Sequence, residues 1–190
     1  MKATRDREGQ VLEEPGAISG LTKVLFLDMD GVLTTRDSIT AAQIKIRKGI
    51  VSGELPPPET WRDKEIYQIV PEMVERLNQI TEATGAKIVW SSSWRLFWDF
   101  EDAKQRFPEW GIEAELIGTT PSMAGPRGNE IQAWLDNHPE VEAFIIVDDS
   151  TDMVHLRDRL VRTRFQDDIP GLVPGLQDHH VEQAIRMLKE

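Results

Sequence analysis

Three short apolar runs stand out along the chain, and each one ends in polar side chains. They span residues 24–27, 86–90 and 144–147. A short run with almost no polar positions is typical of a strand that is covered on both faces, as in a parallel sheet. The sequence therefore predicts at least three buried strands.

Apolar residues between and after these runs recur at helical spacing. The clearest stripe follows Pro71, which suits the first turn of a helix, and stops at Gly85. Strands that alternate with helices predict an α/β fold, a Rossmann-like, mostly parallel sheet with helices on both faces. Residues 116–117 and 160–161 are predicted as further short strands. The stripes are Met73/Val74/Leu77/Ile80, Ile131/Trp134/Leu135, Met153/Leu156/Leu160 and Val181/Ala184/Ile185/Leu188, the last with Asp178 as a candidate cap.

Two segments interrupt this alternation. Residues 1–20 are polar, contain Gly and Pro and have no sustained period, so we expect a flexible N-terminal tail. Residues 34–64 contain a basic cluster and the prolines 56–58, which force an extended stretch. We expect a short helix or one arm of a hairpin there, as a small flap inserted between the first strand and its helix. Residues 21–190 would then form a single domain.

The tryptophan and phenylalanine side chains allow two interpretations, packing in the core or contact with a substrate. Trp90 and Trp134 are most simply core residues. Positions 94, 97 and 98 fall at helical spacing, which predicts a helix packed on the sheet, with Trp94 the best candidate to face a substrate. The pair at 179–180 opens the last predicted helix, and we expect both histidines to be exposed.

Composition restricts the function. The chain has 22 Lys+Arg against 33 Asp+Glu, a net charge of −11 and no cysteine. An acidic surface disfavours a sequence-blind nucleic-acid binder but permits a local basic pocket. Disulfides, thiolate zinc sites and a cysteine nucleophile are excluded. Because the apolar runs are short and residues 1–20 lack the apolar stretch of a secretory signal, we expect a cytoplasmic protein without a membrane partner.

The chemistry lies at the strand ends. The first run is followed by Asp28 and Asp30, the second by Ser91–Ser92 and the third by Asp148–Asp149. Ligands of open α/β sheets bind beyond the carboxyl ends of the strands. Several carboxylates in one crevice repel each other unless a cation lies among them, and oxygen ligands favour Mg²⁺. Such a site suits phosphoryl transfer, in which developing negative charge must be neutralised.

These segments resemble the motifs of the haloacid dehalogenase (HAD) superfamily of phosphohydrolases. Residues 28–32, Asp-Met-Asp-Gly-Val, are similar to its first motif, the end of the Ser91 strand to its second, and residues 148–152 to its acidic fourth motif. The resemblance covers about residues 22–165 in the same order. It implies a HAD fold and a metal-dependent phosphatase.

The resemblance also implies roles for individual residues. Asp28 would be the nucleophile that forms an aspartyl-phosphate, and Asp30 would protonate the leaving oxygen and then activate water. Gly31 would let the chain turn beside the phosphate. Ser91 would hydrogen-bond a phosphoryl oxygen, with Ser92 as the alternative for that role.

A Mg²⁺ site follows from the same resemblance. The carboxylates of Asp28 and Asp148 and the backbone carbonyl of Asp30 would hold the ion. Asp149 is a further candidate ligand of the ion. The sequence does not show whether Asp149 or Asp152 is the better candidate for this role. The acid at position 30 favours phosphatases over dehalogenases and transport ATPases, and the small flap favours phosphatases over mutases.

The third motif of the superfamily is usually a lysine, and here the chain differs. Arg127, at the start of a predicted helix, is the candidate replacement. Its guanidinium has a permanent charge and a bidentate grip on phosphate. The alternative is an exposed arginine near a helix start, where the helix dipole does not favour it.

A narrower resemblance suggests a substrate. Residues 89–95, 120–121, 127–131 and 146–149 are similar to the HAD domains of "Swiss Army knife" RNA-repair proteins. That group implies removal of phosphate from nucleic-acid ends.

Three functions therefore remain open: an RNA-end phosphatase, a phosphatase of nucleotides or another small phosphometabolite, and a HAD-fold binding module with little turnover. The candidate catalytic residues are Asp28, Asp30, Ser91 and Arg127. The candidate substrate-binding residues are Gly31, Ser92, Trp94 and Arg95. The candidate metal ligands are Asp28, Asp30, Asp148 and Asp149.

Overall fold

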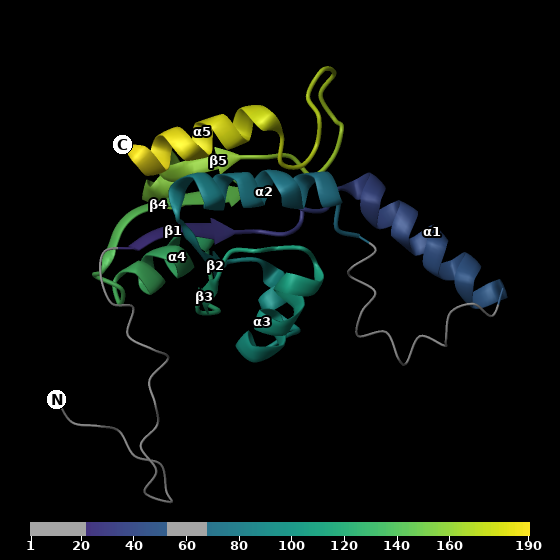
Figure 1. Ribbon diagram of the computed structural model, residues 1–190, viewed down its shortest axis with the longest axis horizontal. Helices are drawn as coiled ribbons and strands as arrows, with labels where there is room; N and C mark the ends of the chain where they lie inside the picture. Colours follow the sequence, from purple (N-terminus) through teal and green to yellow (C-terminus); the bar gives the residue numbers. More distant parts are fainter. Residues whose placement is uncertain (1–21, 53–67) are drawn as a thin grey trace, which may run out of the picture.

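A five-stranded parallel sheet forms the centre of the protein (Figure 1). The structure is a computed structural model that describes residues 22–52 and 68–190. The expected tail of residues 1–20 and residues 53–64 of the expected flap lie outside these described residues. The strands, in the order β3-β2-β1-β4-β5, are β1 Thr22–Leu27, β2 Lys87–Trp90, β3 Leu116–Thr119, β4 Val141–Asp148 and β5 Leu160–Arg162. The predicted α/β class is confirmed, as are the two additional short strands.

Helices cover both faces of this sheet. The helices of the described residues are α1 Arg36–Ser52, α2 Pro71–Thr84, α3 Phe100–Glu109, α4 Arg127–Leu135 and α5 Asp178–Lys189, with short 3₁₀ turns η3 Ser93–Leu96 and η4 Val154–Arg159. As predicted, α2 begins at Pro71 and ends at Gly85, whose φ of 70° is the left-handed conformation of a helix stop. Across residues 22–52 and 68–190, no helix has both the length and the apolar character that a bilayer span requires.

Alternate residues of β1 point to two separate cores. Leu25 and Leu27 pack with α2, α3 and α5, whereas Val24 and Phe26 pack with α4 and η4. All four side chains are fully buried. The run 24–27 has no polar position because a central parallel strand contacts helices on each side.

The register of the sheet brings the strand ends together. Leu27 of β1 pairs with Trp90 of β2 and with Val147 of β4. Beyond these pairs, the amide of Asp28 donates to the carbonyl of Val147 at 3.1 Å, and that of Ser91 donates to the carbonyl of Leu27 at 3.0 Å. The polar residues that follow three different strands are therefore neighbours at one edge of the sheet.

Two helix predictions were wrong. Met153 and Leu156 are buried against α4 and Leu160 is partly buried, but residues 154–159 form the 3₁₀ turn η4, and Leu160 begins β5. The short segment 149–159 must return from the end of β4 to the start of β5, which leaves no room for a full helix.

The tryptophan-rich segment also differs from its prediction. Residues 93–96 form only η3, and the helix α3 starts later, where the Asp99 carboxylate caps the amide of Asp102 at 2.8 Å. Phe97 is 82% exposed, while Trp94 and Trp98 are half-buried against the core. Trp90 and Trp134 are buried as predicted.

Helix α1 accounts for the described part of the expected flap. It is 17 residues long, and it extends away from the sheet beyond the carboxyl end of β1 (Figure 1). A helix was one of the two forms that the sequence allowed for this segment.

His180 is buried, contrary to the expectation that residues 179–180 are both exposed. Its Nδ1 accepts a hydrogen bond from the Gln177 amide at 3.0 Å, and its ring also hydrogen-bonds the backbone of Arg162. The side chain therefore joins the start of α5 to the end of β5. Burial, together with the neighbouring His179, lowers the pKa of His180 from 6.5 to about 4.

We predict that His180 makes the fold sensitive to acid. Because the folded pKa lies below the unfolded one, the unfolded chain binds the proton more readily between about pH 6.5 and 4, and stability falls as the pH drops through that window. The loss is at most about 3 kcal/mol. Urea denaturation of the wild type and of His180→Asn at pH 7.5, 5.5 and 4.5 measures it. The advantage of the wild type should shrink with acid, and an unchanged difference would contradict the assignment.

Candidate functional site

Three carboxylates meet where β1 and β4 end. Asp28, Asp148 and Asp149 each offer an oxygen within 4.8 Å of the others. Asp28 is 3% exposed and Asp148 fully buried. Close carboxylates at this depth repel each other unless positive charge lies among them. This cluster is therefore the centre of the candidate site.

Arg127 supplies positive charge to the cluster. Its Nη1 lies 2.8 Å from Oδ1 of Asp28 and 2.5 Å from Oδ2 of Asp148. Burial opposes the charged form of Arg127, but the charges of Asp28 and Asp148 outweigh it and raise the arginine pKa above its usual range. The predicted alternative of an exposed arginine does not fit, because the side chain is only 20% exposed.

The carboxyl groups nevertheless hold their protons more tightly than usual. Burial raises the pKa of Asp28, although Arg127 opposes it. Burial and the charge of Asp28 raise the pKa of Asp148 to about 7 and that of Asp149 to about 6. One guanidinium therefore does not neutralise the cluster, and a divalent cation would.

The donor set fits Mg²⁺. Three carboxylate oxygens that converge from two strand ends are the hard ligands that this ion prefers. Asp28, Asp148 and Asp149 are the residues that would hold it. Because they carry raised pKa values, binding of the ion would release protons.

Gly31 allows the close approach of Asp149. Its φ is +80°, and a Cβ at this position would lie 2.6 Å from Cβ of Asp149. Any side chain there would displace a carboxylate of the cluster. The glycine of the motif thus serves the carboxylate cluster as well as the turn.

Asp152 has a different role from Asp149. Its Oδ2 accepts the amide of Arg127 at 3.3 Å, and its Oδ1 accepts the hydroxyl of Ser150 at 2.6 Å. Burial opposes ionisation of Asp152, but these hydrogen bonds outweigh it and lower its pKa. Asp152 therefore anchors the start of α4, and with it Arg127, and lies outside the cluster.

Asp30 is held by two donors on separate segments. The indole Nε1 of Trp94 donates to Oδ2 at 2.9 Å, and the hydroxyl of Thr34 donates to Oδ1 at 3.0 Å. Both oxygens of the carboxylate are thereby oriented. Trp94, expected to face a substrate, contacts a candidate catalytic acid instead, a contact that helical spacing could not reveal.

The two serines after β2 differ in what they contact. The side chain of Ser92 hydrogen-bonds the carboxylate of Asp28. The hydroxyl of Ser91 is buried and has no hydrogen-bond partner in the described part of the chain. This geometry favours Ser92, the alternative in the sequence analysis, as the hydroxyl beside the candidate nucleophile.

Arg95 braces the loops around the site. Its Nη1 donates to the carbonyls of Ser91 and Ser92 at 2.9 and 2.7 Å, and its Nε donates to Thr120 at 3.0 Å. Its Nη2 forms a salt bridge with Glu130 at 2.6 Å, in which the side chains are 7% and 11% exposed. Because the guanidinium is engaged by these protein groups, we now propose a positioning role for Arg95 in place of substrate binding.

Glu130 and Thr34 are contributors that sequence reasoning missed. Glu130 is buried and joins α4 to the loop after β2, and its Oε1 also accepts the amide of Met123 at 2.9 Å. An acid in the first turn of α4 gives no signal of burial, because acids are common at helix starts. The spacing of Thr34 from Asp30 gives no signal either, since their contact depends on the turn between them.

Comparison with known proteins supports the motif analysis. Residues 24–169 match the family model of the HAD domain in Swiss Army Knife RNA repair proteins. A search of curated proteins gives no match. A haloacid dehalogenase-like family hydrolase from Streptococcus pneumoniae is similar in structure, with 13% identity, a TM-score of 0.40 and coverage of 86% of this chain and 90% of that chain. A phosphoserine phosphatase from T. onnurineus has 18% identity, a TM-score of 0.39 and coverage of 92% and 99%, respectively.

The raised pKa values predict a pH-dependent effect of Mg²⁺ on stability. Without the ion, the folded chain binds more protons than the unfolded one up to about pH 7, so stability falls as Asp148 and Asp149 ionise with rising pH. Mg²⁺ should reverse this loss. Melting temperatures with Mg²⁺ and with EDTA at pH 5, 6.5 and 8 should differ most at pH 8. An equal difference at all three pH values, or an undiminished one in Asp148→Asn, would contradict the site.

Proposed function

The chain belongs to the family of HAD domains in Swiss Army Knife RNA repair proteins and is a phosphatase of the HAD superfamily. On that basis, we propose that it is a Mg²⁺-dependent phosphomonoesterase that removes phosphate from nucleic-acid ends. One observation carries the proposal more than any other. The buried carboxylates of Asp28, Asp148 and Asp149 share one strand edge with a guanidinium between two of them. Such a site favours a ligand group that is bound through a cation and a fixed positive charge, as a phosphate is.

Asp28 is the nucleophile of the proposed mechanism. Its carboxylate oxygen attacks phosphorus, the bond to the leaving oxygen breaks, and an aspartyl-phosphate forms. Bound Mg²⁺ would supply neutralisation of the charge on the phosphoryl oxygens and on Asp28. Water then attacks phosphorus, releases inorganic phosphate and restores Asp28.

Asp30 moves the proton in both half-reactions. It protonates the leaving oxygen in the first step and takes a proton from water in the second. Its carboxylate is held by the indole of Trp94 and the hydroxyl of Thr34, which limits its rotation. A fixed carboxylate is an efficient acid and base because it needs no reorientation between the two steps.

Arg127 takes the place of the usual lysine. Its permanent charge offsets the repulsion between an incoming phosphate and Asp28. Among the described residues, its side-chain contacts are made through Nη1, so the other N–H groups would bind phosphoryl oxygens. Ser92 is the proposed hydroxyl donor to the same oxygens, and it is already hydrogen-bonded to Asp28.

Two observations support a nucleic-acid end as substrate. The first is the family itself, whose members are described as RNA repair proteins. The second is the turn after Trp94, where Leu96 is 60% and Phe97 82% exposed. An exposed aromatic side chain such as Phe97 can stack a base, and Leu96 adds apolar surface beside it. Activity on mononucleotides alone would favour the small-metabolite alternative, and binding without turnover would favour the binding module.

We expect phosphate release from RNA oligonucleotides that carry a 3′- or 5′-phosphate, with Mg²⁺ but not with EDTA. The comparison substrates are DNA oligonucleotides with the same terminal phosphates, mononucleotides and sugar phosphates. Asp28→Asn should lower kcat by at least about 10³-fold, because it removes the attacking charge at nearly constant volume. Asp158→Asn, an exposed residue of η4, is the matched control and should keep full activity. Near-normal activity of Asp28→Asn would exclude the mechanism.

The contact between Trp94 and Asp30 has its own test. Trp94→Phe keeps an aromatic ring against Trp110 but removes the indole donor. We expect kcat to fall about tenfold with little change in KM, since a hydrogen bond to a charged group is lost while the phosphate contacts remain. Trp98→Phe, on the same loop but without a hydrogen bond to Asp30, serves as control. A rise in KM alone would instead indicate that Trp94 binds substrate.

A further inference from the structure

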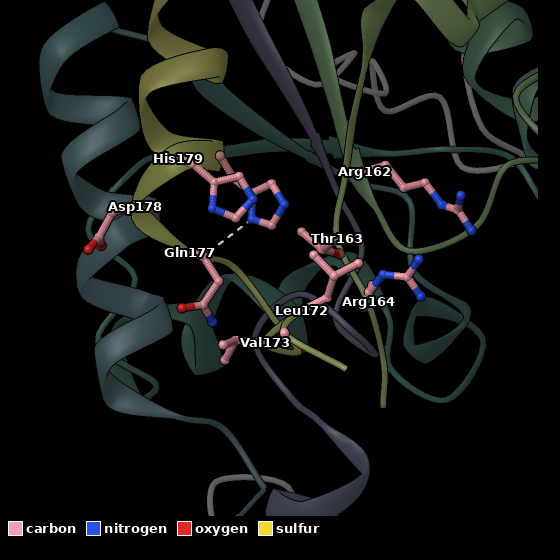
Figure 2. Close-up of a pocket in the computed structure, with 10 residues that line it drawn as sticks. Arg162, Thr163, Arg164, Leu172, Val173, Gln177, Asp178 and His179 are labelled. Atoms are coloured by element: carbon pink, nitrogen blue, oxygen red, sulfur yellow. Dashed lines mark hydrogen bonds between the residues drawn. The ribbon is translucent and has the colours of Figure 1, made fainter. Parts of the chain in front are cut away.

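A cavity lies at the end of β5, next to the strand end that carries the carboxylate cluster. It has a volume of about 460 Å³ and is lined by the last residue of β5 and the two that follow it, by the loop 171–173 and by the start of α5. Figure 2 shows the two arginines of this cavity on one side and His179 on the other, with Thr163 and Leu172 between them. None of these residues belongs to the mechanism proposed above.

The cavity lining carries two arginines and one acid, Asp178, although the protein as a whole is acidic. Arg162 and Arg164 extend their guanidinium groups in the same direction, away from His179 (Figure 2), in a chain whose net charge is −11. In the described part of the chain, Arg162 donates through Nε to the backbone of Asp149 at 3.4 Å, and Arg164 donates through Nη1 to Asp168 at 3.1 Å. A guanidinium has five N–H groups, so both retain donors for an anion.

A buried hydroxyl in the cavity lining also lacks a partner. Thr163 is 1% exposed, and its Oγ1 makes no hydrogen bond within residues 22–52 and 68–190. Buried polar atoms usually have a partner, and a bound group with acceptor oxygens is one that this atom could use. The twelve-residue helix α5 also begins at the cavity, where its dipole favours negative charge.

The cavity adjoins the proposed catalytic centre. Arg162 pairs in register with Asp148, and the amide of Thr163 donates to the carbonyl of Asp148 at 3.0 Å. The wall of the cavity and the wall of the carboxylate cluster are therefore neighbouring strand ends. His180 fixes the opposite wall through its hydrogen bonds to Gln177 and to the backbone of Arg162.

We propose that this cavity binds a second phosphate of the substrate, an internal phosphodiester of the strand whose terminal phosphate lies at Asp28. The inference rests on the proposed function. A strand carries one phosphate per nucleotide, with a rise of about 3.4 Å along the axis when the bases are stacked. A polynucleotide whose terminal phosphate lies at the end of β1 would therefore pass the neighbouring strand ends. Leu172 and Val173, 44% and 64% exposed, offer apolar contacts for the sugar and base beside that phosphate. The enzyme would then distinguish a polynucleotide end from a mononucleotide.

Arg164→Gln tests the cavity without touching the catalytic residues. The substrates are a five-nucleotide RNA with a terminal phosphate at the end that the wild type dephosphorylates, and the corresponding mononucleotide. We expect KM for the RNA to rise about tenfold, because a charge-assisted hydrogen bond is lost, with kcat unchanged. Kinetics on the mononucleotide should not change. Arg157→Gln removes the same charge from an exposed position outside the cavity and should leave both substrates unaffected.

Binding gives a readout without turnover. Fluorescence anisotropy of the same RNA with Asp28→Asn, across a range of salt concentrations, should give a plot of log K against log salt. Adding Arg164→Gln should make its slope shallower by about 0.7, the value for one phosphate contact on a single strand. Arg157→Gln in the same background should leave the slope unchanged.

The outcomes separate this proposal from the proposed function. If the wild type releases phosphate from RNA ends but Arg164→Gln leaves KM and the salt slope unchanged, the cavity proposal is wrong and the function stands. An equal rise of KM for RNA and mononucleotide would also overturn it, because the arginine would then act on the terminal phosphate. If the wild type acts only on small esters, the nucleic-acid substrate fails and the cavity proposal fails with it.

Discussion

The contacts of Arg127 with Asp28 and Asp148 are the interaction on which the rest of the site depends. Two carboxylates at adjacent strand ends, both nearly inaccessible to water, share one guanidinium nitrogen at 2.8 and 2.5 Å. Loss of one partner from a buried ion pair costs about 3–5 kcal/mol, because a charge is left without compensation. The pKa of Asp148, about 7, indicates that the compensation is incomplete even with Arg127 present. The residual charge is what makes the cluster suited to a cation.

Much of the surrounding structure keeps Arg127 in place. Asp152 binds the backbone at the start of α4, and Gly128 lets the helix approach Met153, where a Cβ would clash with the backbone oxygen. The buried pair of Arg95 and Glu130 joins the same helix to the loop after β2. Residues that could be mistaken for substrate contacts are thus used to fix the geometry of a set of mutually repelling charges. A preorganised site of this kind needs little rearrangement during the reaction.

The sequence predicted the strands, the order of the motifs and the residues of the carboxylate cluster well, because those features depend on short periods and on strand ends. In a parallel sheet, residues that follow neighbouring strands meet at one edge. The sequence alone therefore indicates that Asp28 and Asp148 lie close together. The helix predictions for residues 94–98 and 153–160 were wrong, since the available chain length sets whether an apolar stripe becomes a helix or a 3₁₀ turn. Burial of His180 was missed because it depends on the backbone of Arg162, in another segment.

The sequence by itself determined the fold class, the family and the strand-end acids, because periodicity and motif order depend on residues that are close together in the sequence. Only the tertiary structure decided between neighbouring candidates. It places Ser92 rather than Ser91 beside Asp28, Asp149 rather than Asp152 in the cluster, and Trp94 against Asp30. Adjacent residues on one loop have the same sequence context, yet they point in different directions. A difference of one to three positions therefore decides whether a hydroxyl or carboxylate points toward the carboxylate cluster, and only the packed backbone sets that direction.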